Sequence, residues 1–375
     1  MSQLFSPATL RGLHLRNRAV VAPMCQYSAK DGFANDWHLV HLGRFAIGGF
    51  GLVILEAAGV TPEARISYAD LGLWQDEHIA PLSRIVDFLH SQGAAAGIQL
   101  AHAGRKASTP VTWHDELIKT DAGKIEAGYE QWTPVGPSAV AHNADPAFTT
   151  PTALDQAGID GVIQAFVAAA IRAEKAGFDT VEIHAAHGYL LNQFLSPLAN
   201  SRTDQYGGSR ENRMRLPLQV VEAVRAVWPA DKPLLVRISV SDNRPDGWQP
   251  EDSVVLSQEL KARGVDAVHC SSGGFDGGVI NSVANYQVPF SKTVRDGAGI
   301  PTIAVGLIST PEEAEAILAD GAGDFVALAR GALDDPNWAV HARLALDGAN
   351  YDLWPDPTKR VESMDRSLKR HSFAK

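Results

Sequence analysis

The sequence has few of the features that mark secreted or membrane-bound proteins. Only two of its 375 residues are cysteine, Cys25 and Cys270, and their separation fits neither a disulfide framework nor a cysteine metal site. This scarcity favours a reducing, cytoplasmic location. Residues 1–6 lack a basic segment followed by an apolar stretch, so they predict no signal peptide. No apolar run approaches the roughly 18 residues of a membrane span.

A net positive charge is also missing. The 43 Asp and Glu residues outnumber the 33 Lys and Arg residues, which gives a net charge of −10 at pH 7. Because binding to a phosphate backbone needs a basic face, this balance predicts no nucleic-acid partner and no anionic membrane surface. It remains compatible with a local basic pocket for one phosphate. Hydrophobic residues, at 45%, supply the core of a globular chain.

Eight short apolar runs alternate with helical patterns along the chain. Because the runs show no polar alternation, they suit strands of a parallel sheet that is buried on both faces. Eight βα units without a break in composition predict an α/β fold, a single (β/α)8 TIM barrel, in preference to a doubly wound open sheet. The runs centre on residues 19–22, 52–55, 97–100, 181–183, 234–238, 266–268, 302–305 and 325–328.

Helical segments fall between these runs. Residues 77–92 carry apolar side chains at helical spacing, and residues 154–177 are rich in alanine. Thr310 to Glu313 has the form of a capping box with a proline at the first helical position, and Gly321 suits the end of that helix.

The barrel is expected to occupy residues 1–346, with a tail at 347–375. Residues 1–17 precede the first strand and predict an N-terminal hairpin across the bottom of the barrel. Residues 103–152 separate the third strand from its helix and carry two tryptophans and several prolines. An excursion of this length predicts a functional lid or subdomain rather than a bare loop.

The active site of such a barrel lies at the carboxyl ends of its strands, so the residues that follow each run are the candidates. Polar, ring-bearing and glycine residues gather there: Pro23 to Tyr27, Glu56, Gln99, His102, His184 to Tyr189, Arg237, Cys270 to Gly274, Gly306 and Arg330.

Gly306 and Arg330 follow the seventh and eighth strands, where barrels of this kind bind phosphate. A glycine lets a phosphate approach the backbone, and an arginine supplies a charge-assisted hydrogen bond. The alternative is that Gly306 only forms a turn.

Arg237 lies inside an apolar strand, where a guanidinium is costly unless it is paired or meets an anionic ligand. One interpretation is a structural pair with Glu56 or another rim carboxylate. The functional interpretation is a charge beside a ring that becomes anionic on reduction, such as a flavin near N1 and the C2 oxygen. Gln99 would then bind the same pyrimidine edge.

The pair His184 and His187 has three interpretations: a metal site, two core histidines, or two donors to a carbonyl or nitro oxygen that gains negative charge. No third ligand stands nearby in the sequence, so we expect no metal. Tyr189 follows two residues later and stays protonated at neutral pH, which allows it to act as a general acid.

Cys25 ends the first strand and has three interpretations as well. A lone cysteine is usually a small hydrophobic residue. Its place on the rim favours a role beside a cofactor. A catalytic nucleophile is less favoured, because no neighbouring base marks it.

Several of these segments together resemble the old yellow enzyme family, in particular its bacterial xenobiotic-reductase-like ene-reductases with a cysteine at the end of the first strand. The similarity covers about residues 3–345. The segments are Pro23–Tyr27, Gly97–Lys106, His184–Tyr189 and Asn200–Ser209.

The resemblance implies non-covalent FMN and a cycle in which NADPH or NADH delivers hydride to flavin N5 before an enone or nitro acceptor takes hydride at its β carbon. Tyr27, His184 and His187 would hold the acceptor's oxygen, Tyr189 would protonate its α carbon, and Cys25 would tune the flavin potential. The implied FMN contacts are Ala22, Pro23, Met24, Cys25, Ala57, Gln99, Arg237, Gly306, Ala329 and Arg330.

The resemblance also implies a homo-oligomer, a dimer or tetramer, in which a tail residue of one subunit reaches its neighbour's site. Trp354 and Arg360 stand in the corresponding tail, but the residues between them differ from the family pattern, so neither is assigned that role.

Other functions remain open at this stage. An amine demethylase of the same family fits the same residues. A dienoyl-CoA reductase is disfavoured because the iron–sulfur cluster of the larger members needs closely spaced cysteines. A non-redox barrel, such as a phosphosugar isomerase or aldolase, would need a strand-end lysine or a carboxylate base, and Glu56 is the one acid considered for that place. A flavin carrier without turnover is the fourth alternative.

Overall fold

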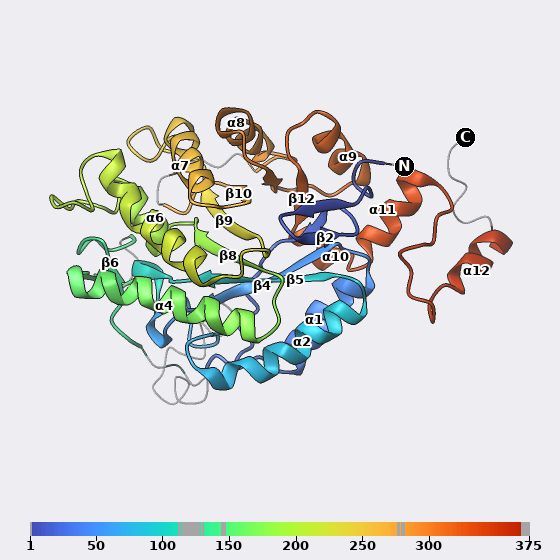
Figure 1. The fold of residues 1–375 in the computed structure, drawn as a ribbon, viewed down its shortest axis with the longest axis horizontal. Coiled ribbons are helices and arrows are strands. Elements are labelled where there is room, and N and C mark those ends of the chain that lie inside the picture. The colour runs from blue at the N-terminus through green and yellow to red at the C-terminus, as the bar shows by residue number, and fades with distance from the viewer. Residues whose placement is uncertain are drawn as a thin grey trace.

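The computed structural model describes residues 2–111, 113, 129, 131–143, 148–275, 278 and 282–368. Eight parallel strands form one closed barrel, in which each strand pairs with the next along the chain and the last pairs with the first. The predicted (β/α)8 TIM barrel is confirmed (Figure 1). Its strands are β3 (Ala19–Val21), β4 (Leu52–Gly59), β5 (Ala95–Ala101), β8 (Thr180–Ala185), β9 (Leu234–Ser239), β10 (Ala267–Ser271), β11 (Thr302–Ala304) and β12 (Phe325–Leu328).

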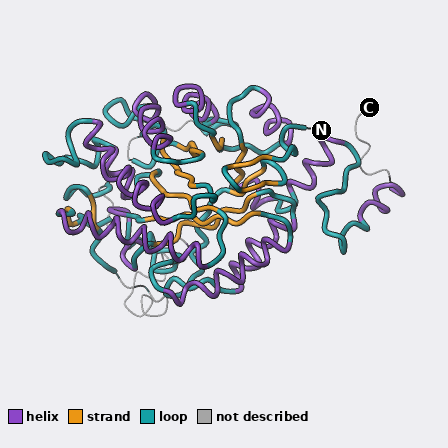
Figure 2. The backbone as a smooth tube through the Cα atoms, viewed as in Figure 1, coloured by secondary structure: helices purple, strands orange, loops and turns teal. Residues whose placement is uncertain are grey.

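Helices surround the strands, as the purple turns outside the orange barrel in Figure 2 show. They supply the second layer that buries the outer faces of the strands. They are α1 (Asp36–Ile47), α2 (Ile79–Ser91), α4 (Gln156–Lys175), α5 (Leu190–Leu195), α6 (Arg210–Val227), α7 (Pro250–Ala262), α8 (Val288–Ala298), α9 (Pro311–Ala319), α10 (Arg330–Asp334) and α11 (Trp338–Asp347).

The start of α9 confirms the predicted capping box. The Thr310 hydroxyl accepts from the Glu313 backbone N–H at 3.2 Å, and the Glu313 carboxylate accepts from the Thr310 N–H at 3.0 Å. Gly321 follows the helix with a φ of +61°, a left-handed conformation that glycine adopts without strain. The helix predicted at residues 77–92 is divided into a 3₁₀ turn, Asp76–His78, and α2.

The predicted N-terminal hairpin is also present. Strands β1 (Ala8–Leu10) and β2 (Leu13–Leu15) pair antiparallel and place Leu10 and Leu15 against the residues that fill one end of the barrel. This contact closes that end of the barrel with apolar side chains.

The barrel interior changes from apolar to polar along the strands. Alternate residues of a strand point inward, so one strand contributes to successive interior layers. On β9 the buried Leu235 is followed two residues later by Arg237, and on β10 the buried Ala267 is followed by His269. The apolar layers near the hairpin include Val20, Leu52, Ile54, Leu235, Ala267, Ile303, Phe325 and Ala327. The polar layers therefore lie toward the carboxyl ends of the strands.

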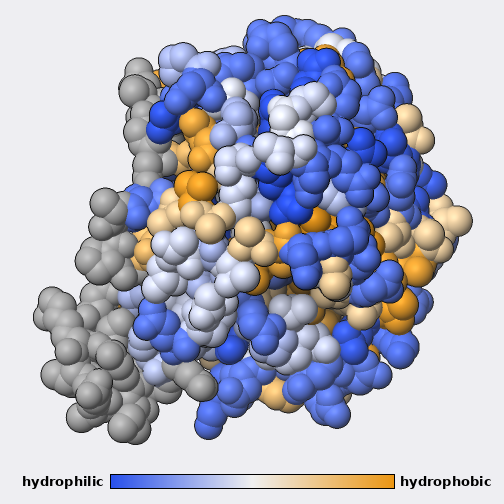
Figure 3. Space-filling model, turned by 90° about the vertical axis from the view of Figure 1, so that its left-hand side faces the viewer, coloured by the Kyte–Doolittle hydropathy of each residue, from blue (hydrophilic) through white to orange (hydrophobic). Residues whose placement is uncertain are grey.

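The end of the molecule away from the hairpin faces the viewer in Figure 3, where apolar areas interrupt a mostly hydrophilic surface near its centre. Part of the excursion at 103–152 is described: a 3₁₀ turn at Gly104–Lys106, and β6 (Val135–Gly136), which pairs with β7 (Thr152–Ala153). Residues 112, 114–128, 130 and 144–147 of the excursion lie outside the described residues.

The tail continues beyond α11 into α12 (Val361–Leu368), which stands apart from the barrel at the right of Figure 1. The Trp354 ring lies 6.0 Å from the ring of His341 on α11, between ring centroids, and Arg360 directly precedes α12. Residues 369–375 of the predicted tail are outside the described residues. Among the described helices, none is both long and apolar enough to cross a membrane.

Candidate functional site

A buried polar network lies across β5, β8, β9 and β10. Gln99 donates from Nε2 to Glu182 Oε1 at 2.7 Å, and Glu182 Oε2 lies 2.8 Å from His269 Nδ1. The strand register places Gln99 beside Glu182, and it places Arg237 between His184 and His269. All five residues are less than a tenth exposed. The barrel thus gathers in its polar interior residues that are far apart in the sequence.

This network holds an ionised carboxylate and a guanidinium. Burial alone would raise the pKa of Glu182, but His269, Arg237 and Gln99 together hold it below its ordinary value. Burial, and then the charge of Arg237, lower the pKa of His269, so its neutral ring donates Nδ1–H to Glu182. Burial also lowers the pKa of Arg237, against the opposing charge of Glu182.

The Arg237 guanidinium is incompletely satisfied. Its Nε is buried and has no hydrogen-bond partner among the described residues. Leaving a buried donor unpaired costs about 1–3 kcal/mol, and more when the group is charged. Nε is too enclosed for a ligand atom to reach it, so the part of the guanidinium open to a ligand is the part that lines the cavity described below.

The interpretation in which Arg237 pairs with Glu56 is wrong. Glu56 accepts from the backbone N–H of Gln26 at 2.8 Å and lies 3.3 Å from His38 Nε2. These partners allow β4 to continue through Glu56 to Gly59, beyond the apolar run that predicted it. The carboxylate that balances the charge of Arg237 is Glu182.

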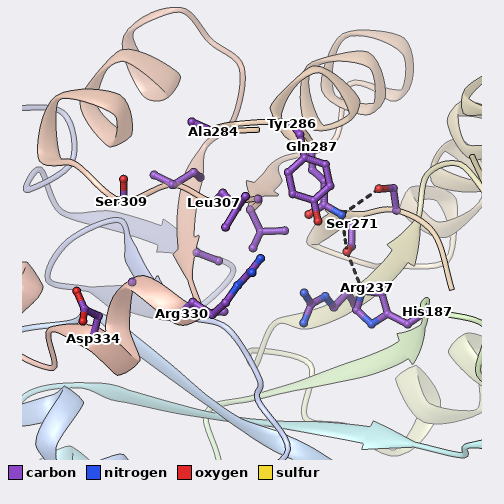
Figure 4. A pocket seen from close by; sticks show the side chains of 17 residues that line it. His187, Arg237, Ser271, Ala284, Tyr286, Gln287, Leu307, Ser309, Arg330 and Asp334 are labelled. Carbon is purple, nitrogen blue, oxygen red and sulfur yellow. Dashed lines mark hydrogen bonds between the residues drawn. The ribbon is translucent and has the colours of Figure 1, made fainter. Parts of the chain in front are cut away.

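A cavity of about 590 Å³ opens beside this network at the ends of β9 to β12. Figure 4 shows Arg237, from β9, and Arg330, from the start of α10, extending into the same space. Arg237 is only 7% exposed, whereas Arg330 is open to solvent. The lining also includes His187, Ser271, Tyr286, Gln287, Val305, Gly306, Leu307, Ala327, Ala329 and Asp334.

Gly306 lies in the wall of this cavity. Its φ is +128°, which strains any other residue, and a Cβ there would lie 2.9 Å from the Cβ of Gln287. The glycine therefore lets the chain pass close to Gln287. The cationic side chain of Arg330 lines the same wall and suits a phosphate group.

His184 and His187 lie at the mouth of the barrel with their ring centroids 5.1 Å apart and their planes at 85°. Burial, and then the charge of Arg237, lower the pKa of both rings well below the ordinary value, so both are neutral. The Ala186 backbone N–H donates to His184 Nδ1 at 3.2 Å. Since a backbone N–H can only donate, the proton of the neutral His184 ring lies on Nε2.

The backbone of His187 is held in a left-handed conformation, with a φ of +60°. Its N–H donates to Ser239 Oγ at 2.8 Å, and its carbonyl accepts from Lys106 Nζ at 3.0 Å. A non-glycine residue in this region is strained, and such strain occurs often at functional sites.

The loops after β8 and β10 touch at a crossing of two glycines. A Cβ at Gly188 would collide with the carbonyl oxygen of Gly274, and a Cβ at Gly274 would collide with the backbone of His187. Both glycines have a positive φ, +72° and +115°. The absence of two side chains therefore brings His187 next to β10.

Tyr27 and Tyr189 pack in a small apolar cluster with Cys25 and Trp132, around Ile66, Ala103 and Ala107. The Tyr189 ring lies 5.0 Å from the His184 ring, centroid to centroid, at 76°. Burial, and then the nearby Cys25, raise the pKa of both phenols well above the ordinary value. The two phenols therefore stay protonated at neutral pH.

Burial raises the pKa of the Cys25 thiol as well, and the carboxylates of Asp70 and Glu56 raise it further. The thiolate is the nucleophilic form of cysteine, so this environment disfavours a covalent role for Cys25.

The predicted site residues fall into two groups. His187, Arg237, Gly306, Ala329 and Arg330 line the cavity, whereas the others lie outside its lining. Within this second group, Ala57 is the register neighbour of Gln99, and Ala22 donates its N–H to Leu328 O at 2.9 Å. The second group is Ala22, Pro23, Met24, Cys25, Tyr27, Ala57, Gln99, His184 and Tyr189.

Three residues of this region were not predicted: Glu182, His269 and Gln287. Ser271 stood among the strand-end candidates without an assigned role. Glu182 and His269 could have been found, because each is an ionisable residue inside an apolar strand, which is the signal that identified Arg237. Ser271 and Gln287 carry no such signal. No group of three or more His, Cys, Asp or Glu side chains suited to a metal occurs among the described residues.

Comparison with known proteins agrees with this geometry. The profile of the NADH:flavin oxidoreductase / NADH oxidase family matches residues 3–347. The NADPH dehydrogenase of Geobacillus thermodenitrificans (strain NG80-2) is 48% identical over 341 residues, which cover 90% of this chain and 93% of that protein. The NADPH dehydrogenase of Geobacillus sp. (strain WCH70) is 44% identical, covering 91% and 94%.

Among solved structures, morphinone reductase in complex with tetrahydroNAD superposes with a TM-score of 0.75. The two sequences are 30% identical, and the match covers 96% of this chain and 94% of that one. The match therefore spans nearly the whole of both chains.

Proposed function

The chain belongs to the NADH:flavin oxidoreductase / NADH oxidase family, the old yellow enzymes, and we propose that it is an FMN-dependent ene-reductase. Its electron source would be NADPH or NADH, and its acceptors would be small α,β-unsaturated carbonyl or nitro compounds. The family and its NADPH dehydrogenase relatives identify the chain as an NAD(P)H-dependent flavin oxidoreductase.

The buried guanidinium of Arg237 is the observation that carries the proposal. It lines a cavity of about 590 Å³ and is only 7% exposed. A flavin pyrimidine edge would offer acceptors to the guanidinium where it faces the cavity. Gln99 would bind the same edge, and Gly306 and Arg330 would hold the phosphate at the other end of the cavity. Ala22, Pro23, Met24, Cys25, Ala57 and Ala329 are proposed as the remaining contacts.

When bound, FMN supplies the redox chemistry, accepting hydride from the nicotinamide and passing it to the β carbon of the acceptor. The protein's contribution is orientation and charge. His184 and His187 are neutral, so each can donate one N–H to the acceptor's oxygen, where negative charge grows. Tyr27 is proposed to hold the acceptor from the first strand.

Tyr189 is the proposed proton donor. Its phenol is protonated, lies against His184, and belongs to the apolar cluster with Cys25 and Tyr27. In this position it would deliver a proton to the α carbon while the histidines hold the oxygen. Cys25 is proposed to act through its uncharged thiol on the potential of the flavin.

The test is anaerobic spectroscopy of the purified protein. We expect a bound flavin whose visible absorbance bleaches on addition of NADPH or NADH and returns on addition of cyclohexenone. Bleaching without return in the presence of enones and nitro compounds would leave a flavin carrier. Purification of a native protein that neither contains nor binds flavin would overturn the proposal.

A further inference from the structure

We propose that Gln287, acting through Ser271, fixes the tautomer of His187, so that its Nδ1 carries the proton and faces the ligand as a donor. Gln287 and Ser271 are then positioning residues for the proposed acceptor site. The inference concerns the histidine ring itself, and its use in catalysis rests on the proposed function.

The hydrogen bonds around Ser271 set a direction (Figure 4). Gln287 donates from Nε2 to Ser271 Oγ at 3.1 Å and to Ser272 Oγ at 3.0 Å. An amide NH₂ has two hydrogens, and these two contacts use both. Ser271 Oγ therefore accepts from Gln287, and its own hydrogen remains available.

That hydrogen points to His187. Ser271 Oγ lies 2.7 Å from His187 Nε2, so the hydroxyl donates and Nε2 accepts. With the Gln287 amide oriented as in the structure, the opposite arrangement would have His187 Nε2–H donate to Ser271 and would leave the Ser271 hydrogen without an acceptor among the described residues. Since Ser271 is only 3% exposed, an unpaired hydrogen there is unfavourable.

A neutral imidazole carries one proton, so an accepting Nε2 places it on Nδ1. The charges of Arg237 and Lys106 and the burial of the ring keep His187 neutral by lowering its pKa. His187 Nδ1 makes no hydrogen bond to a described residue, and it is the ring nitrogen left for a ligand. The two neighbouring imidazoles thus present protons from different nitrogens, Nε2 of His184 and Nδ1 of His187.

The hydrogen bonds from Gln287 to Ser271 and from Ser271 to His187 form a relay, and its direction decides whether His187 attracts or repels an acceptor's oxygen. With the proton on Nδ1 the ring donates to an oxygen that gains negative charge. With the proton on Nε2, the Nδ1 atom would instead present a lone pair to that oxygen. The backbone contacts of His187 with Ser239 and Lys106 place the ring but do not select between these states.

Nuclear magnetic resonance of ¹⁵N-histidine-labelled full-length protein, as purified and oxidised, tests this directly. Long-range ¹H–¹⁵N correlation spectra distinguish protonated from unprotonated ring nitrogens, and the spectrum of His187→Gln identifies the His187 signals. We expect a protonated Nδ1 and an unprotonated Nε2 at His187. The reverse pattern in the wild-type protein would overturn the inference.

The Gln287→Glu variant should reverse the relay. A carboxylate can only accept, so the Ser271 hydrogen turns toward it, and Nε2 of His187 gains the proton. Ser272→Ala is the matched control, because it removes the other hydroxyl bound by Gln287 and should leave the proton on Nδ1. An unchanged tautomer in Gln287→Glu would overturn the inference.

If Gln287→Glu does not fold, Gln287→Met serves instead. It removes the donor without adding a charge, and a mixture of the two tautomers is expected; a pure Nδ1–H ring would contradict the relay. The spectra report on the ring whether or not the protein turns over enones. A failure of the ene-reductase proposal is therefore separable from a failure of this inference.

Discussion

Replacing Glu182 by glutamine is expected to weaken the fold and raise the midpoint potential of the bound flavin together. Glu182 is fully buried, and its two oxygens accept from Gln99 at 2.7 Å and lie 2.8 Å from His269 Nδ1. Its charge is also the main favourable partner of Arg237. Glutamine keeps the shape and one acceptor oxygen, but it turns an NH₂ group toward a second donor.

The magnitude follows from these contacts. A hydrogen bond to a charged group contributes about 1.5–3 kcal/mol, and a neutral bond about 1 kcal/mol. One bond becomes neutral and the other is lost, so the free energy of unfolding of the flavin-free protein should fall by about 2–5 kcal/mol. With Arg237 no longer balanced, an added negative charge on the flavin is better stabilised. For a two-electron couple, about 1.4 kcal/mol of such stabilisation raises the potential by roughly 30 mV.

Urea denaturation followed by tryptophan fluorescence gives the first quantity, and dye-equilibrated reductive titration gives the second. Glu182→Asp is the control, because it keeps the charge and changes the packing. It should lose stability yet keep a potential near that of the wild type. A Glu182→Gln protein with an unchanged or lower potential would refute the role of Glu182 as the counter-charge of Arg237.

Four further outcomes are expected. Alanine at both His184 and His187 should lower kcat/KM for enones by about a hundredfold or more and leave flavin content near normal; equal turnover would refute the donor role. Tyr189→Phe should slow reoxidation by enones while flavin bleaching by NADPH keeps its rate; the opposite pattern would assign Tyr189 to the nicotinamide. Cys25→Ala should shift the flavin potential and retain activity, whereas complete loss would revive the nucleophile. Burial lowers the pKa of His102 from 6.5 to about 4, so the unfolded chain binds a proton below pH 6.5 that the folded chain refuses. The free energy of unfolding of the wild type, relative to that of His102→Asn, should therefore fall by about 2 kcal/mol from pH 7 to pH 5. Urea denaturation at each pH measures both free energies. If the two proteins change equally with pH, His102 does not have the lowered pKa.

The sequence predicted the barrel well because its strands are buried on both faces. Eight apolar runs have no other common explanation, and the capping box at Thr310 marks a helix start by local chemistry alone. The extension of β4 to Gly59 escaped prediction, because it depends on His38 and Gln26 satisfying the carboxylate of Glu56. Local sequence cannot show that such partners exist.

In the candidate site, too, only residues that carry a local signal in the sequence could be predicted. Arg237 could be identified because a charge in an apolar strand needs a partner, and Glu182 carried the same signal without being recognised. The contacts of Gln287 with Ser271 depend on how the loop after β10 returns to the barrel. Serine and glutamine are common at many surfaces, so their types alone gave no indication of a shared role.

The crossing of Gly188 and Gly274 limits how this barrel can be recombined with its relatives. Loop grafting usually treats each βα loop as an independent module, but here two loops share one contact that excludes side chains from both. A chimera that imports the segment after β8 must import the segment after β10 with it, or retain glycine at both positions. Chimeras that mix the two segments and lose either glycine should accumulate in inclusion bodies, while those that exchange the segments as a pair should stay in the supernatant.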